Sequence, residues 1–102
     1  MPSISGAGII RVAVFSFKTE VTETQKEESL RAAQVWEQVP GVLAVEQGPC
    51  LGDDPPYQYM RLIYYADTEA RARLLAHPIH DRWAEITRPL TLKHTGFAIA
   101  VE

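Results

Sequence analysis

Four segments of the chain carry the apolar pattern that is typical of β-strands. Each is short, contains β-branched or aromatic residues and is bounded by turn-forming residues, which distinguishes it from an amphipathic helix. The predicted strands cover residues 8–17, 42–48, 57–66 and 92–101. A four-stranded sheet is therefore expected.

The first helical region lies between the first two predicted strands. It begins at the capping-box spacing of Thr22 and Gln25, continues through helix-forming residues to Val39, and ends at Pro40-Gly41. We expect about four turns, with an inner stripe that includes Trp36.

The second helical region lies between the third and fourth predicted strands and is broken once. A helix capped by Asp67 or Thr68 is expected to reach about Ala76, and Pro78 suits the first turn of a further short helix that ends near residues 88–89. The sequence HPIH, residues 77–80, marks the break.

The order of elements is β-α-β-β-α-β, which predicts an α+β, ferredoxin-like fold with the helices on one face of an antiparallel sheet. We expect residues 1–8 to form a flexible N-terminus and residues 9–102 to form a single domain. With 102 residues, of which 46% are hydrophobic, the chain can bury one small core.

Alternation along the first and third predicted strands assigns their side chains to two faces. One face combines two arginines with aromatic residues: Arg11, Phe15, Phe17, Tyr59 and Arg61. The other face is apolar and contains Val12, Val14, Met60 and Leu62. Since the helices can cover only one face, a second copy of the chain is expected to cover the other, which predicts a homodimer.

The two histidines of HPIH are candidate acid/base groups, because an imidazole can take up and return a proton near neutral pH. His80 is the stronger candidate, provided that it faces a pocket. The alternative is structural, with His77 capping the helix that begins at Pro78 and His80 packed in the core. A metal site would need a third ligand, and we expect neither a metal nor another cofactor.

Arg11 and Arg61 are candidate anion-stabilising groups. A buried guanidinium is costly without a partner, so each should meet a carboxylate, carbonyl groups or a bound anion. The competing interpretation is an internal salt bridge to Glu46 or exposure of the arginine tip at the edge of the sheet. We take Tyr59 as an orienting hydroxyl because it shares the face of Arg61, and we take Trp36 and Trp83 as core or pocket-wall residues.

Charge and hydropathy exclude several partners. The chain has 10 basic and 13 acidic residues, a net charge of −3, and no basic stripe that would bind nucleic acid. No apolar run approaches the roughly 20 residues of a membrane span, and the first residues lack the pattern of a signal peptide, so we expect a cytoplasmic protein without a membrane partner.

Together, these features resemble the stress-responsive dimeric α/β-barrel (Dabb) domain family, which includes olivetolic acid cyclase-like proteins. The resemblance rests on Phe17-Lys18, Pro40-Gly41-Val42, Gly48, the tyrosine-rich third strand and, above all, HPIH, and it covers about residues 9–101. It implies a homodimer in which two sheets form a barrel, with a pocket between each sheet and its helices.

The resemblance also implies roles for individual residues. His80 corresponds to the acid/base histidine of the cofactor-free cyclases, which close a poly-β-keto thioester by an aldol reaction. Leu74, Arg11 and Ala98 stand where the cyclase pattern has a tyrosine, a histidine and an aspartate.

The sequence therefore predicts a small cofactor-independent enzyme, a cyclase, lyase or isomerase that acts on a carbonyl or carboxylate compound, for example in polyketide or secondary metabolism. The predicted catalytic residues are His80, Arg11, Arg61 and Tyr59, and the predicted substrate-binding residues are Phe15, Phe17, Trp36, Leu74, His77 and Trp83. Two alternatives are a non-catalytic dimeric module that binds a ligand or serves in a stress response, and a cofactor-free oxygenase of the dimeric-barrel type.

Overall fold

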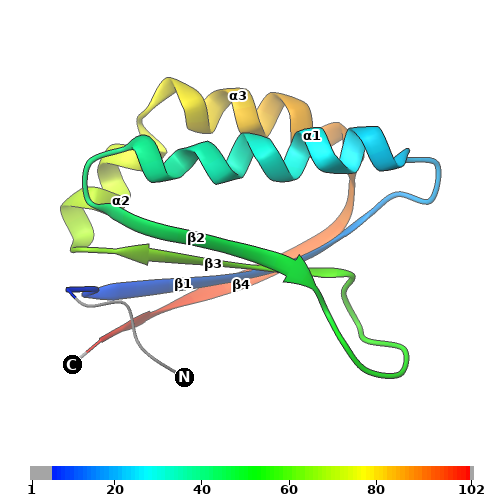
Figure 1. The fold of residues 1–102 in the computed structure, drawn as a ribbon, viewed down its shortest axis with the longest axis horizontal. Coiled ribbons are helices and arrows are strands. Elements are labelled where there is room, and N and C mark those ends of the chain that lie inside the picture. The colour runs from blue at the N-terminus through cyan, green and yellow to red at the C-terminus, as the bar shows by residue number, and fades with distance from the viewer. Residues whose placement is uncertain (1–5, 102) are drawn as a thin grey trace.

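The computed structural model describes residues 6–101, which form one antiparallel sheet with helices on one side of it (Figure 1). The strands are β1 (Ile9–Phe17), β2 (Val42–Pro49), β3 (Tyr59–Tyr65) and β4 (Thr91–Ala100), in the spatial order β2-β3-β1-β4. The helices are α1 (Glu23–Gln34), α2 (Thr68–Leu75) and α3 (Pro78–Thr87). The predicted ferredoxin-like fold is confirmed.

The sheet begins just before β1. Residues 1–5 of the predicted flexible N-terminus lie outside the described residues. Gly8, however, donates its N–H to the carbonyl of Tyr65 at 2.8 Å, and its own carbonyl accepts from the N–H of Val101 at 2.9 Å. The backbone at Gly8 therefore extends the hydrogen-bonded ladder to the strands on both sides of β1.

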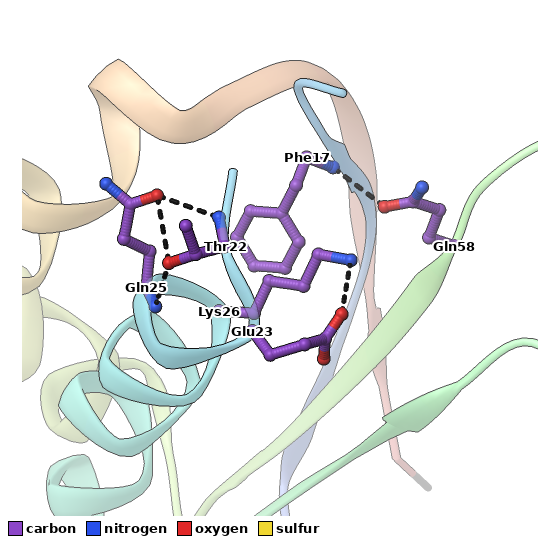
Figure 2. A network of polar contacts seen from close by, with 6 residues as sticks. All are labelled: Phe17, Thr22, Glu23, Gln25, Lys26 and Gln58. Carbon is purple, nitrogen blue, oxygen red and sulfur yellow. Dashed lines mark hydrogen bonds and ion pairs between the residues drawn. The ribbon is translucent and has the colours of Figure 1, made fainter. Parts of the chain in front are cut away.

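The capping box that was predicted at the start of α1 is present (Figure 2). The Thr22 hydroxyl accepts from the Gln25 N–H at 3.2 Å, while the Gln25 side-chain oxygen accepts from the Thr22 N–H at 2.8 Å. The α-helix ends earlier than expected, at Gln34, and residues Val35–Gln38 tighten into a 3-10 turn, η1. Pro40 explains why no helix continues, because it favours the extended backbone that Val39 adopts (ψ 127°).

The hydrophobic core lies between the sheet and the helices in two clusters. The larger one contains Trp36, Val45, Ile63, Tyr65 and Leu74 among its buried members. The smaller one lies at the end of β1, where Phe15 and Phe17 pack with Val21 and Tyr59. The N–H of Phe17 donates to the Gln58 side chain at 3.0 Å (Figure 2), which ties this end of β1 to the segment before β3.

The opposite face of the sheet has no helix over it (Figure 1). The register pairs Val12 with Phe97 and Ile10 with Ile99, so these side chains share that face with Met60. Phe97 is 62% exposed and Ile99 50% exposed. No helix within residues 6–101 is both long enough and apolar enough to cross a membrane.

Candidate functional site

A cavity of about 420 Å³ lies between the helices and the face of the sheet that they cover. Its wall includes the aromatic rings of Phe15 from β1, Trp36 from η1, and His80 and Trp83 from α3. Arginines from β1, α2 and the turn after α3 also line it, and Arg61 reaches it from β3. The cavity therefore combines flat apolar surfaces with positive charge.

Arg61 is the most unusual residue of this cavity, because its charged side chain is only 3% exposed. The guanidinium carbon lies 4.5 Å from the ring centroid of Phe15, 5.3 Å from that of Trp36 and 5.2 Å from that of Trp83. Aromatic faces attract a cation through their quadrupole, and the attraction increases when water is excluded. Three rings thus hold the Arg61 guanidinium in place without neutralising its charge.

The hydrogen-bond partner of Arg61 is an uncharged amide. Its Nε donates to the side-chain oxygen of Gln47 at 2.9 Å, and the Gln47 nitrogen donates to the Leu30 carbonyl at 2.8 Å and to the Gln34 side chain at 3.2 Å. Burial lowers the pKa of Arg61 to about 10. The side chain therefore remains a cation at neutral pH, with its position fixed by amides.

Three buried N–H groups among the described residues have no hydrogen-bond acceptor: Nη2 of Arg61, Nε1 of Trp36 and Nε1 of Trp83. All three side chains line the cavity. Buried donors in folded proteins nearly always have a partner, so three unpaired donors on side chains of one cavity wall make this wall a candidate site for an acceptor. We call Arg61, Trp36 and Trp83 the donor cluster.

His80 stands beside the donor cluster on the first turn of α3. Its ring stacks on Trp36, with centroids 5.3 Å apart and planes at 27°, and lies 5.2 Å from the ring of Trp83. Burial lowers the pKa of His80; Arg88 and Arg61 lower it further, and Asp81 opposes them. The imidazole is consequently neutral at pH 7 and able to accept a proton.

His77 has a structural role. Its Nδ1 accepts from the Ile79 N–H at 3.1 Å, which makes His77 the N-cap of α3, with Pro78 in the first turn. The cap aligns the first turn of α3, on which His80 lies. His77 itself does not line the cavity, contrary to its predicted contact with substrate.

The structure brings most of the predicted site residues together. The cavity is lined by Arg11, Phe15, Trp36, Arg61, Leu74, His80 and Trp83. Besides His77, the exceptions are Phe17 and Tyr59, which pack in the smaller core cluster. Tyr59 shares the face of Arg61, as expected, but it lies two residues before Arg61, at the start of β3. Its ring stacks there on Phe15 at a centroid distance of 5.7 Å. Its predicted role as an orienting hydroxyl therefore has no support from its position.

The competing interpretation of Arg61 as the partner of Glu46 is wrong. Glu46 lies opposite Leu62 in the β2–β3 ladder, on the other face of the sheet from Arg61. There it accepts from the Tyr64 hydroxyl at 3.3 Å. Arg61 consequently has no carboxylate partner among the described residues.

Four titratable residues that line the cavity were missed as site residues: Tyr65, Arg71, Arg88 and His94. Tyr65 could have been suspected, because it shares the face of Arg61 on β3, whereas the position of His94 opposite Phe15 depends on the β1–β4 register. Burial raises the pKa of Tyr65, while the positive charges of Arg71 and Arg11 act to lower it. No Asp or Glu lines the cavity within residues 6–101.

Comparison with known proteins identifies the family. The model of the Stress responsive A/B Barrel Domain matches residues 9–97. The chain belongs to this family. It has no significant match among curated proteins.

Solved structures of the same fold resemble the chain at low sequence identity. A dimeric ferredoxin-like protein of unknown function from Thermobifida fusca has a TM-score of 0.82 at 20% identity, covering 99% of this chain and 97% of its own. A hydroxynitrile lyase from Passiflora edulis has a TM-score of 0.80 at 14% identity, covering 94% and 95%. A cofactor-independent oxygenase from Streptomyces nogalater has a TM-score of 0.75 at 18% identity, covering 94% of each chain. These similarities establish the shared fold, and two of the three structures are of enzymes.

Proposed function

We propose that this Dabb-family protein is a cofactor-independent enzyme that removes a proton from the carbon next to a carbonyl group. The observation that carries the proposal is that a neutral histidine and a cluster of unpaired N–H donors line one cavity. Enolisation requires a base at the carbon and a stabilising group at the oxygen. His80 supplies the first, and the donor cluster of Arg61, Trp36 and Trp83 supplies the second.

The proposed step transfers one proton and no net electrons. A ring nitrogen of His80 takes the proton, the C–H electron pair forms a C=C bond, and the carbonyl oxygen acquires the negative charge. The donor cluster then stabilises the enolate, and the imidazolium returns the proton to the same carbon or to another one. A cyclase, a lyase or an isomerase could each use this step.

The burial of Arg61 suits this role, because an aromatic, water-poor wall strengthens its attraction for a developing oxyanion. The cation is also in place before the reaction, held by Gln47 and three rings. Stabilisation that increases as charge develops raises the rate of the chemical step, whereas equal binding of substrate and transition state does not.

We also propose that the chain acts as a homodimer that buries the helix-free face of the sheet. Exposed Phe97, Ile99 and Met60 on that face support this arrangement. Related structures described as dimeric and ferredoxin-like support it as well.

Two alternatives keep an observation in their favour. The His80 ring has no hydrogen bond to another described residue that would orient it. A non-catalytic ligand-binding module would not need such a bond, so its absence favours that alternative. A cofactor-free oxygenase would need to bind an activated aromatic substrate, and Trp36 and Trp83 offer rings on which such a substrate can stack. Measurement of oxygen consumption separates that reaction from enolisation.

The test is hydrogen–deuterium exchange of the acetyl methyl groups of acetophenone and 4-acetylbenzoate in D2O, followed by proton NMR. We expect the protein to accelerate exchange of at least one probe, and His80→Gln to lose at least about 100-fold of that acceleration. The matched control is His77→Asn, which preserves a capping side chain outside the cavity and should retain the rate. Full activity in a folded His80→Gln variant would overturn the proposal, as would the absence of any acceleration by the wild-type protein.

A further inference from the structure

The cavity has a second positively charged region, at a distance from the donor cluster. The β-ladder places Arg61 on β3, Ala13 on β1 and Gly96 on β4 directly across from one another. Adjacent strands are about 4.8 Å apart, so β3 and β4 are separated by roughly 10 Å at this level. The small side chain of Ala13 lines the cavity between them.

The guanidinium of Arg11 occupies the β4 side of this row. A Cβ atom placed on Gly96 would lie 3.1 Å from Nη2 of Arg11. The Arg11 side chain therefore lies over Gly96, where the absence of a side chain leaves room for it. Arg61, by contrast, points to Phe15, Trp36 and Trp83.

Arg71 on α2 lines the same cavity as Arg11 and adds a second cation to its wall. No carboxylate among the described cavity residues neutralises either of them. Arg11 and Arg71 are also more exposed than Arg61, so a charged group placed between them keeps part of its hydration.

We propose that the substrate is a flat keto acid, with the reacting carbonyl at the donor cluster and a permanent carboxylate between Arg11 and Arg71. The assignment of the two ends rests on the proposed function, since the reacting oxygen must lie beside His80. A carboxylate pairs well with a guanidinium, and the aromatic residues in the cavity wall favour a planar body between the two ends. The anion-binding pair determines which carbonyl compounds enter and how they are oriented.

The test compares the binding of two probes of nearly equal shape, 4-acetylbenzoate and its uncharged analogue 4-acetylbenzamide, by isothermal titration calorimetry at low salt. We expect the acid to bind at least about tenfold more tightly than the amide. Arg11→Gln should remove this preference by weakening only the acid, and Arg11→Lys should restore part of it. The matched control is Arg82→Gln, which makes the same charge change on α3 outside this cavity and should retain the preference.

The proposal is overturned if the acid and the amide bind equally, if Arg11→Gln weakens both by the same factor, or if neither probe binds. A thermal unfolding curve for each variant excludes loss of folding as the cause. Exchange of the acetyl methyl protons separates this proposal from the proposed function. Preferential binding of the acid without proton exchange supports the carboxylate site and overturns the proposed function. Proton exchange without any preference for the acid supports the proposed function and overturns the carboxylate site.

Discussion

The imidazole of His80 stacks against the indole of Trp36, with 5.3 Å between the ring centroids. This contact fixes the ring beside the donor cluster and excludes water from one of its faces. The same burial that positions the ring also makes its protonation unfavourable.

The pH dependence of His80 follows from this burial. Desolvation lowers the pKa, Arg88 and Arg61 lower it further, and Asp81 opposes them. We therefore expect its NMR titration midpoint to lie below the ordinary value of about 6.5, and the exchange rate to rise with pH through that midpoint and then level off. A midpoint above 6.5 would contradict the assigned environment.

Stability should change in the same pH range. The unfolded chain takes up a proton at His80 at a higher pH than the folded chain does, so the contribution of His80 to stability is complete above about pH 6.5 and is lost as the pH falls through the folded pKa. In urea unfolding experiments, His80→Gln should show a smaller decrease in the free energy of unfolding between pH 7 and pH 5 than the wild type.

Arg61→Met should separate stability from function. The variant removes a buried charge that lacks a carboxylate partner and keeps an apolar side chain of similar length. We expect the free energy of unfolding to be unchanged or about 1–2 kcal/mol higher, while binding of 4-acetylbenzoate is lost. A large loss of stability would instead mean that the three aromatic rings stabilise the cation enough to outweigh its desolvation.

Gln47→Leu should lower the free energy of unfolding, in contrast to Arg61→Met. It leaves Nε of Arg61 without its hydrogen-bond partner and removes the bond from Gln47 to the carbonyl of Leu30. Unsatisfied buried groups cost about 1–3 kcal/mol, so we expect a loss of that size in urea unfolding, together with weaker probe binding. Gln38→Leu is the control, since Gln38 is exposed and should tolerate the same change.

Gly96→Ala should disturb the cavity from β4. The new Cβ would lie 2.6 Å from the backbone oxygen of Val12 and 3.1 Å from Nη2 of Arg11. We expect a destabilisation of about 1–3 kcal/mol and a reduced preference for the acid over the amide probe. Gly48→Ala is matched to it, because a Cβ there has no atom within 4 Å, and it should leave both measurements unchanged.

Phe97→Glu tests the proposed homodimer by placing a charge on the helix-free face. A buried, unpaired carboxylate is costly, so we expect sedimentation analysis to show dimers for the wild type and monomers for the variant. The control is Leu51→Glu, in a loop where the side chain is 89% exposed. A wild-type protein that sediments as a monomer, or a Phe97→Glu variant that remains dimeric, would rule out this interface.

Alternation along the strands was enough to predict which side chains share a face of the sheet, but it left open which face the helices cover. Phe15, Phe17 and Arg61 all point to that face, because side chains on a strand alternate strictly. Alternation does not tell how far along a strand the cavity extends. For that reason Tyr59 was expected at the site, although it packs beyond the end of the cavity.

The missed arginines depend on tertiary geometry. Arg71 and Arg88 belong to exposed positions at α2 and just after α3, and the tilt of these elements over the sheet brings the side chains to the cavity. Similarly, the position of His94 depends on the β1–β4 register, which shifts between Ser16 and Phe17. Neither the tilt of a helix nor a bulge of this kind is encoded in a local pattern.

The four arginines of the cavity lie in a chain whose net charge is −3. The rest of the surface therefore repels an anion while the mouth of the cavity attracts it, and the approach of an anion is guided electrostatically to one place. Such steering acts on the association rate and is screened by salt, with a Debye length of about 10 Å at 0.1 M. The absence of carboxylates from the described cavity wall thus influences how quickly an acid reaches His80, as well as how firmly it is held there.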